Sequence, residues 1–262
     1  MNLSGEKRFD FGVNWQSYSQ SSLTPEHFER ALESLKSLFQ LENFGGGSFL
    51  DVGCGSGIFS IAAKRLGAGS VLGVDISEHS VRTSAGNAKA MNIPATEIRF
   101  EQMDVLDGRR FDALGQYDYV YAWGSLHHTG CMWEAIDAAC RRVKPGGVFA
   151  LAIYNRNFSS GFWKQIKRFY NQGPRVLQKP MIAVFGGMIF AGKWIYTRQD
   201  PRRMHRGMDF YHDVVDWVGG YPYEYASRRQ VIEHVAKHGF IMTHCVPAHI
   251  PLANNQFVFR RQ

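Results

Sequence analysis

The chain has 262 residues, 45% of them hydrophobic and 20% charged, which fits one globular domain with an insertion better than two independent domains. A formal charge of +7 and a pI near 9.3 favour contact with an anionic partner. Charge alone does not decide between nucleic acid, a phosphorylated metabolite and a membrane surface.

The first nine residues are polar and charged and lack the apolar run of an export signal, so we expect a cytoplasmic protein. The longest apolar stretch, 181–192, is shorter than the roughly 20 residues of a membrane span, so no transmembrane helix is expected. The cysteines contain no CxxC pair, which predicts neither a disulfide framework nor a zinc site. They are Cys54, Cys131, Cys140 and Cys245.

Strands and helices alternate along most of the chain. Thr24 and Pro25 start an amphipathic helix over about 25–40. Strands are predicted at 48–52, 71–76, 98–103, 117–123 and 148–154, with helices at 58–66, 77–92 and 132–143 and a turn at 144–147. Short apolar strands between helices predict a doubly wound α/β fold with a mostly parallel sheet, of Rossmann-like type.

The alternation stops after Asn155 and resumes at Ser227, where a capping box opens a helix to Lys237. Strands at 240–246 and 256–259 follow, and they predict an antiparallel C-terminal end to a seven-stranded sheet. The predicted organisation is an N-terminal helical cap (1–44), a core (45–155), an insertion or lid (156–226) and a C-terminal helix and hairpin (227–262).

Glycines at alternate positions follow the first predicted strand. Gly53, Gly55 and Gly57 let the backbone approach a ligand and leave N–H groups at the helix start free to donate. A dinucleotide fingerprint needs G-x-G-x-x-G, but here the third glycine comes one position early, which argues against NAD.

Two acids end the next two predicted strands. Asp75 is placed to accept hydrogen bonds from both hydroxyls of a ribose, and Ile76 beside it is placed to lie against an adenine. Asp104, followed by Val105, ends the third strand and is suited to receive the adenine amino group.

Together with Trp123–His128 (WGSLHH) and Lys144–Gly147 (KPGG), these motifs resemble the class I S-adenosylmethionine-dependent methyltransferases over about 45–155 and the terminal hairpin. The resemblance implies S-adenosyl-L-methionine as cofactor and S-adenosyl-L-homocysteine as product. It assigns Asp51 and the glycine loop, with Cys54 as a small buried residue, to the methionine part, Asp75 to the ribose and Asp104 to the adenine. Trp123 is expected where the methionine arm passes.

The aromatic segment at residues 9–18 looks like the part that many small-molecule methyltransferases fold over the cofactor. Tyr18 is the candidate contact there. The alternative is that Trp15 and Phe11 dock on the sheet edge and Tyr18 makes no ligand contact.

Methyl transfer needs alignment of an acceptor and exclusion of water, and a base when the acceptor carries a proton. His127 and His128, just beyond the fourth strand, are candidate bases because histidine titrates near neutral pH, and His128 is the better candidate. The alternative is that they brace the loop. Tyr154 and Asn155 end the fifth strand and are expected to face the acceptor.

Residues 206–224 are dense in aromatic and hydrogen-bonding side chains and predict a substrate lid. Its acids and histidines also suit a solvated helix face, and we expect no metal there. They are His205, Asp209, His212, Asp213 and Asp216. Just before the lid comes a basic cluster that predicts an anionic acceptor, unless it is only a solvated surface. It comprises Lys193, Arg198, Arg202, Arg203 and Arg206.

The sequence therefore predicts methyl transfer to oxygen or nitrogen of a small-molecule acceptor. An RNA methyltransferase is the second hypothesis: the pI supports it, but the strand-four segment lacks the Asn/Asp-Pro-Pro-aromatic motif of amine methylases, and DNA is not expected. Non-methyl chemistry of the sulfonium and an NAD-type nucleotide-binding protein are further alternatives. A homodimer is compatible with the sequence.

Overall fold

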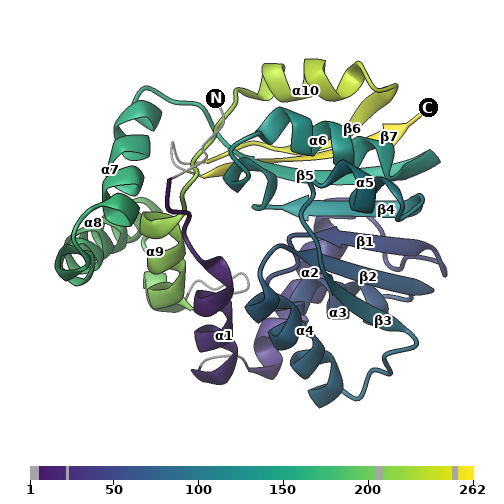
Figure 1. Ribbon diagram of the computed structural model, residues 1–262, viewed down its shortest axis with the longest axis horizontal. Helices are drawn as coiled ribbons and strands as arrows, with labels where there is room; N and C mark the ends of the chain where they lie inside the picture. The colour runs from purple at the N-terminus through teal and green to yellow at the C-terminus, as the bar shows by residue number, and fades with distance from the viewer. Residues whose placement is uncertain (1–5, 22–23, 204–208, 250–252) are drawn as a thin grey trace.

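In the computed structural model, which describes residues 6–21, 24–203, 209–249 and 253–262, a seven-stranded sheet forms the centre (Figure 1). Its order is β3-β2-β1-β4-β5-β7-β6. The strands are β1 (Ser48–Val52), β2 (Ser70–Asp75), β3 (Ile98–Gln102), β4 (Tyr117–Trp123), β5 (Val143–Tyr154), β6 (Phe240–Val246) and β7 (Asn254–Arg261). Strands β1 to β5 pair in parallel, and β7 is antiparallel to both β5 and β6. The predicted doubly wound α/β fold is confirmed.

Helices cover both faces of the sheet. The α-helices are α1 (Phe11–Ser21), α2 (Pro25–Phe39), α3 (Ile58–Arg65), α4 (Glu78–Ala90), α5 (Gly108–Asp112), α6 (Met132–Arg141), α7 (Ser160–Gln172), α8 (Gln178–Thr197), α9 (Phe210–Gly219) and α10 (Arg228–Ala236), and the short 3-10 turns are η1 (Leu126–His128), η2 (Arg175–Leu177) and η3 (Pro201–Arg203). Side chains of α2 and α3 pack with Phe49 on one face, whereas those of α5, α6 and α10 pack with Leu50 on the other. Continuous apolar strands therefore supply two cores, as expected of a parallel sheet.

The fifth strand is longer than predicted. Residues 144–147 were expected to form a turn, but they lie inside β5, which pairs with β4 from Val143 onward. The register shifts between Tyr117 and Tyr119, so the Pro-Gly-Gly segment is absorbed as an irregularity of the strand.

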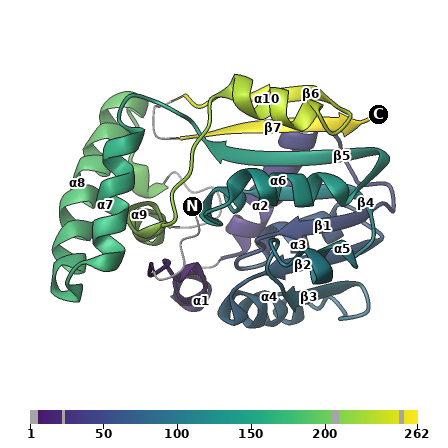
Figure 2. The same cartoon turned by 45° about the horizontal axis from the view of Figure 1, so that its top comes forward.

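Helices α7, α8 and α9 occupy most of the segment between β5 and α10 and lie beside the carboxyl ends of the parallel strands, together with α1 (Figures 1 and 2). They have a small core of their own, in which Val214 and Val218 of α9 contact Ile182 and Phe185 of α8. In Figure 2 the arrow of β5 points toward these helices and that of β7 points away from them. The helical segment therefore stands where parallel α/β sheets bind ligands.

Within the described parts of the chain, the structure contains no helix whose length and apolar character would suffice to cross a bilayer.

Candidate active site

A cavity of about 1180 Å³ lies at the carboxyl edge of the sheet, between the strands and the helices α1, α7, α8 and α9. Eleven of the residues predicted to form the site line it. They are Asp51, Gly53, Cys54, Asp75, Ile76, Asp104, Val105, Trp123, His127, His128 and Tyr154. The fold thus brings together side chains from the ends of five different strands, β1 to β5.

Glycine is required in the loop between β1 and α3 because this loop runs directly against neighbouring side chains. Gly53 and Gly55 have φ values of 80° and 57°, in the left-handed region. A Cβ on Gly53 would lie 2.3 Å from Cβ of Ser125, and one on Gly55 would lie 2.8 Å from the Trp15 ring. Gly55 and Gly57 do not themselves line the cavity; Gly57 is the N-cap of α3.

Asp75 links the glycine loop to the start of α4. Its Oδ2 accepts a hydrogen bond from the Gly55 N–H at 3.0 Å, and its Oδ1 accepts one from the Ser77 N–H at 2.9 Å. Burial raises its pKa, and these backbone donors counteract the increase. The Ser80 hydroxyl also interacts with this carboxylate and lowers its pKa. A carboxylate has about four acceptor positions, so Asp75 retains at least one for a ligand hydroxyl.

The other two acids differ in their surroundings. Asp104 lines the cavity, and its Oδ1 accepts from the Leu106 N–H at 2.9 Å. Asp51 is buried and accepts a hydrogen bond from the Ser60 hydroxyl at 2.6 Å, while burial raises its pKa to about 7. Asp51 therefore braces the start of α3 beneath the loop, and Asp104 is the more accessible of the two.

The far end of the same wall is made by β4 and β7. Trp123 donates its Nε1–H to Oε1 of Gln256 at 3.2 Å, and both residues line the cavity. This hydrogen bond fixes the tryptophan ring at the strand end. Gln256 was not predicted from the sequence, since nothing in the pattern of a terminal strand indicates which of its side chains reaches across β5 to β4.

His128 has a defined tautomer. Its Nδ1 lies 2.6 Å from the carbonyl oxygen of Pro222, which can only accept, so Nδ1 carries the proton and Nε2 keeps a lone pair. Burial lowers its pKa to about 3. The expectation that this histidine titrates near neutral pH is therefore wrong: His128 stays neutral because its environment desolvates the charged form.

His127 and Tyr154 form an aromatic wall next to His128. Their rings lie 4.2 Å apart, and Tyr154 also contacts Tyr223 at 4.9 Å. Burial holds the pKa of His127 well below its usual range and raises that of Tyr154. Both groups are neutral at physiological pH, so this part of the wall is uncharged.

Besides Gly55 and Gly57, two predicted residues, Tyr18 and Asn155, do not line the cavity. Tyr18 is fully buried, with its ring against Trp15, His27 and His212, and the same helix presents Trp15 to the cavity instead. Asn155 accepts a hydrogen bond at Oδ1 from Asn255 of β7, at 3.0 Å, and so ties the end of β5 to β7. Both are placed as structural residues, because each already packs or bonds inside the protein.

The helical half of the cavity is largely apolar and was only outlined by the sequence as an aromatic-rich lid. The side chains that line it come from the N-terminal segment and from α7, α8 and α9. They include Phe9, Phe11, Trp163, Met188, Ile189, Phe210 and Trp217. The high aromatic content of this segment is visible in the sequence. The packing of α7, α8 and α9 that brings these side chains together could not be predicted from it.

A buried lysine and a buried acid stand behind this wall. Lys167 Nζ lies 4.6 Å from the Trp217 ring centre and 4.9 Å from that of Tyr223, and it has no hydrogen-bond partner among the described residues. Burial lowers its pKa to about 7. Asp216, which accepts from Asn14 Nδ2 at 2.6 Å, has its pKa raised by burial to about 8.

The acids of the predicted lid have separate partners. Asp209 caps α9 and its Oδ2 lies 2.5 Å from Nδ1 of His212, whereas Asp213 pairs with Lys193 at 2.8 Å. His205 lies outside the described residues. The described acids are therefore engaged in capping and ion pairs.

Two cations of the predicted basic cluster are paired with acids. Lys193 lines the cavity but bonds to Asp213, and Arg202 bonds to Asp200 at 2.9 Å. Arg206 and the side chain of Arg203 lie outside what the structure describes, and the backbone of Arg198 ends α8. Among the members of this cluster whose side chains the structure describes, only Lys193 lines the cavity.

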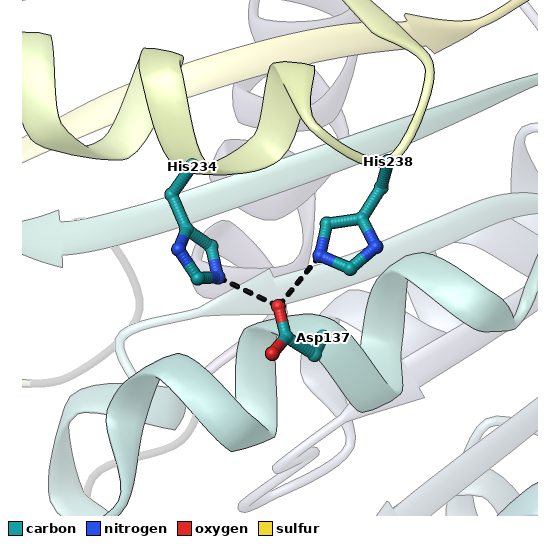
Figure 3. Close-up of side chains that lie close together, drawn as sticks. All are labelled: Asp137, His234 and His238. Carbon is teal, nitrogen blue, oxygen red and sulfur yellow. Dashed lines mark hydrogen bonds and ion pairs between the residues drawn. The ribbon is translucent and has the colours of Figure 1, made fainter.

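Asp137, His234 and His238 form a cluster that the sequence did not predict (Figure 3). Both histidine Nε2 atoms lie close to the same Oδ1 of Asp137, at 2.6 and 2.7 Å. These are hydrogen-bond lengths, shorter than the spacing of ligand atoms around a transition metal. These hydrogen bonds join α6 to α10 and to His238 just beyond it, and none of the three residues lines the cavity.

The order of the strands, the glycine loop and the acids at adjacent strand ends define the Rossmann-like class of proteins, which bind nucleotide-containing ligands at this edge of the sheet. Residues 25–183 match the family model described as "Methyltransferase domain", which is more than half of the chain. The chain belongs to this methyltransferase family, and the predicted family membership is confirmed.

Among curated relatives, a ribosomal protein L11 methyltransferase of Neisseria gonorrhoeae is 49% identical over 113 residues, which are 43% of this chain and 34% of that protein. A ubiquinone biosynthesis O-methyltransferase of Psychrobacter arcticus is 34% identical over 112 residues, 43% of this chain and 42% of that protein. The chain therefore matches less than half the length of these relatives.

Solved structures share the fold over nearly the whole chain. Magnesium protoporphyrin IX methyltransferase from Synechocystis PCC 6803, with bound SAH, superposes with a TM-score of 0.60 at 16% identity and covers 95% of this chain and 94% of that one. An O-methyltransferase family protein from Burkholderia thailandensis gives 0.58 at 14% identity, over 90% of this chain and 57% of that one.

Proposed function

We propose that the protein is an S-adenosylmethionine-dependent methyltransferase that methylates oxygen or nitrogen of a small, largely apolar acceptor. The observation that carries this proposal is the division of one cavity into two unlike halves. One half is built from the glycine loop and the acids at the strand ends, the other from apolar side chains of α1 and α7 to α9, and His128 also lines it.

The residues present fit the cofactor. Asp75 lines the cavity and retains at least one acceptor position for a ribose hydroxyl, and Asp104 is accessible for an adenine amino group. Ile76, an apolar side chain that lines the cavity, is 54% exposed and would be covered by an adenine ring. Trp123 and the Gly53 loop would hold the methionine part. When bound, S-adenosylmethionine supplies an electrophilic methyl group on a sulfonium.

The protein's own contribution is alignment, dehydration and proton acceptance. The aromatic side chains of the helical half keep water from the reacting atoms and hold an apolar acceptor. His128 is neutral, its Nδ1–H is held by Pro222, and Nε2 is left to accept the acceptor's proton. A weak base is sufficient here, because a hydroxyl that gains a methyl group becomes strongly acidic as the new bond forms.

An anionic acceptor and RNA are the competing substrates. Of the described basic cluster only Lys193 lines the cavity, and its pairing with Asp213 favours an uncharged acceptor, although Arg8 of the N-terminal segment also lines the cavity. The L11 methyltransferase relative makes protein a third substrate class to test.

The cofactor part of the proposal is tested by calorimetric titration with S-adenosylhomocysteine. Asp75→Ala should weaken binding about 100-fold, since the ribose loses a charged acceptor. Glu78→Ala is the matched control, because Glu78 lies three residues away and bonds only to the exposed Arg82 in this structure. Unchanged affinity in folded Asp75→Ala would overturn the assignment.

The acceptor part is tested by transfer of labelled methyl groups from S-adenosylmethionine. Hydroxylated and amino-bearing apolar small molecules are offered in parallel with total RNA and ribosomal protein. Label on the small molecules supports the proposal. Label on RNA or protein alone would replace it.

A further inference from the structure

The outer side of α8 is an apolar surface that faces away from the rest of the protein. Val184 and Ile195, about three turns apart, lie on one side of this 20-residue helix and are 61% and 72% exposed. The opposite side, with Ile182 and Phe185, packs on α9. Figures 1 and 2 both place α8 at the edge of the molecule farthest from the sheet.

The neighbouring segments expose further large apolar side chains. Ten of the fifteen exposed large hydrophobic residues found in the described chain fall between Phe158 and Tyr196. They are Phe158, Phe162, Phe169, Val176, Leu177, Val184, Met188, Trp194, Ile195 and Tyr196. Soluble monomers rarely gather so many on one segment unless a partner covers them.

The same segment carries positive charge only. No Asp or Glu occurs between Asp137 and Asp200. Eight cations stand between Arg156 and Arg198, of which Arg168 pairs with Glu6 and Lys193 with Asp213. Lys167 is buried, and the other five are exposed: Arg156, Lys164, Arg175, Lys179 and Arg198.

We propose that the outer face of α8 docks on the surface of an anionic lipid bilayer. The apolar side chains of α8, which include a tryptophan, suit the boundary of the acyl chains. Lys179 and Arg198 stand at the two ends of the helix and suit the phosphate headgroups. A symmetric dimer through this face would bring two purely cationic segments together, which disfavours a second copy as occupant. The helix lies on the membrane and does not cross it, since its inner side remains packed on α9.

The cavity opens beside this face. Phe158, Met188 and Tyr196 line the cavity and are also solvent-exposed, Phe158 at 97%. Docking would therefore place the mouth of the acceptor half at the lipid surface, so that an apolar acceptor enters from the bilayer. This second step rests on the proposed function, whereas docking itself does not.

Sedimentation with lipid vesicles tests the docking. The full chain should bind vesicles of phosphatidylcholine with about one third phosphatidylglycerol, bind pure phosphatidylcholine weakly, and lose binding as sodium chloride rises. Arg175→Gln/Lys179→Gln should weaken binding about 30-fold, and Val184→Ser/Ile195→Ser should weaken it at least tenfold. None of these four residues lines the cavity, so the affinity for S-adenosylhomocysteine should be unchanged.

The matched controls are Ile241→Ser/Met242→Ser, exposed apolar residues of β6, and Lys89→Gln/Lys237→Gln on other helices. Equal losses in the controls, or no binding to anionic vesicles, would overturn the proposal. So would light scattering that shows a dimer split by Val184→Ser/Ile195→Ser. Vesicle binding without cofactor binding would refute the proposed function alone, and turnover of a detergent-dissolved acceptor without vesicle binding would refute docking alone.

Discussion

The two halves of the cavity are held in place by different interactions. In the half at the strand ends, backbone atoms set the geometry: N–H groups of Gly55 and Ser77 bond to Asp75, and the Gly53 backbone contacts Ser125. In the helical half, side-chain packing of α7 to α9 does so, around a separate small core. We infer that the half set by backbone atoms, the proposed cofactor site, tolerates little change, whereas the proposed acceptor half can be remodelled through its side chains.

The largest effect on stability is expected at the backbone-defined half. Gly53→Ala should lower the free energy of unfolding by about 2–5 kcal/mol, because a φ of 80° strains alanine and its Cβ would overlap Ser125. Gly86→Ala, in α4 with nothing within 4 Å of its Cβ position, should instead gain up to about 1 kcal/mol. Urea denaturation measures both, and similar stabilities for the two variants would contradict the argument.

A change at His128, in the wall beside the cavity, should affect turnover more than binding. His128→Gln should lower kcat about 100-fold and leave the affinity for S-adenosylhomocysteine unchanged, since it removes only the proton acceptor. Because burial lowers the pKa of His128 to about 3, wild-type kcat should show no His128 titration near pH 6.5. Wild-type turnover in the variant would return His128 to a loop-bracing role.

The same lowered pKa makes stability depend on pH. The unfolded chain binds a proton at His128 below about pH 6.5 and the folded chain does not until about pH 3, so this group destabilises the fold as pH falls through that window. Between pH 7 and pH 5 the free energy of unfolding of His128→Gln, measured by urea denaturation, should fall less than that of the wild type.

The smallest effect is a change in motion. Amides of α7 to α9 should exchange faster than those of β1 to β5 without ligand and slow down when cofactor product and acceptor are bound, because few polar contacts fix the helical half. Hydrogen exchange followed by mass spectrometry measures this. Equal protection in the free and bound states would mean that these helices are a rigid wall.

Much of the fold and the cofactor half could be predicted from the sequence because their constraints are local. Alternating apolar strands and helices indicate a parallel sheet, and positive φ values demand glycine at fixed positions such as Gly53. The predicted residues Asp75, Ile76 and Asp104 do lie on one cavity wall, although their ligand contacts remain predictions.

Other features depend on contacts distant in sequence and were missed. The neutral state of His128 results from burial, which outweighs the opposing hydrogen bond to the Pro222 carbonyl, 94 residues away. Tyr18 and Trp15 share one helix, and only tertiary packing decides that Trp15 reaches the cavity. The Pro-Gly-Gly segment was predicted as a turn but lies within β5, because pairing with the distant strand β4 accommodates it as an irregularity of register.

The position of β7 has a consequence for synthesis of the protein. Strand β6 is made first, yet its only sheet neighbour among the described strands is β7, which separates it from β5. Gln256 of β7 also holds Trp123 at the cavity wall. A nascent chain on the ribosome therefore carries an open sheet edge and an unfinished cavity until β7 emerges, so that competence to bind ligand should arise in one late step of folding.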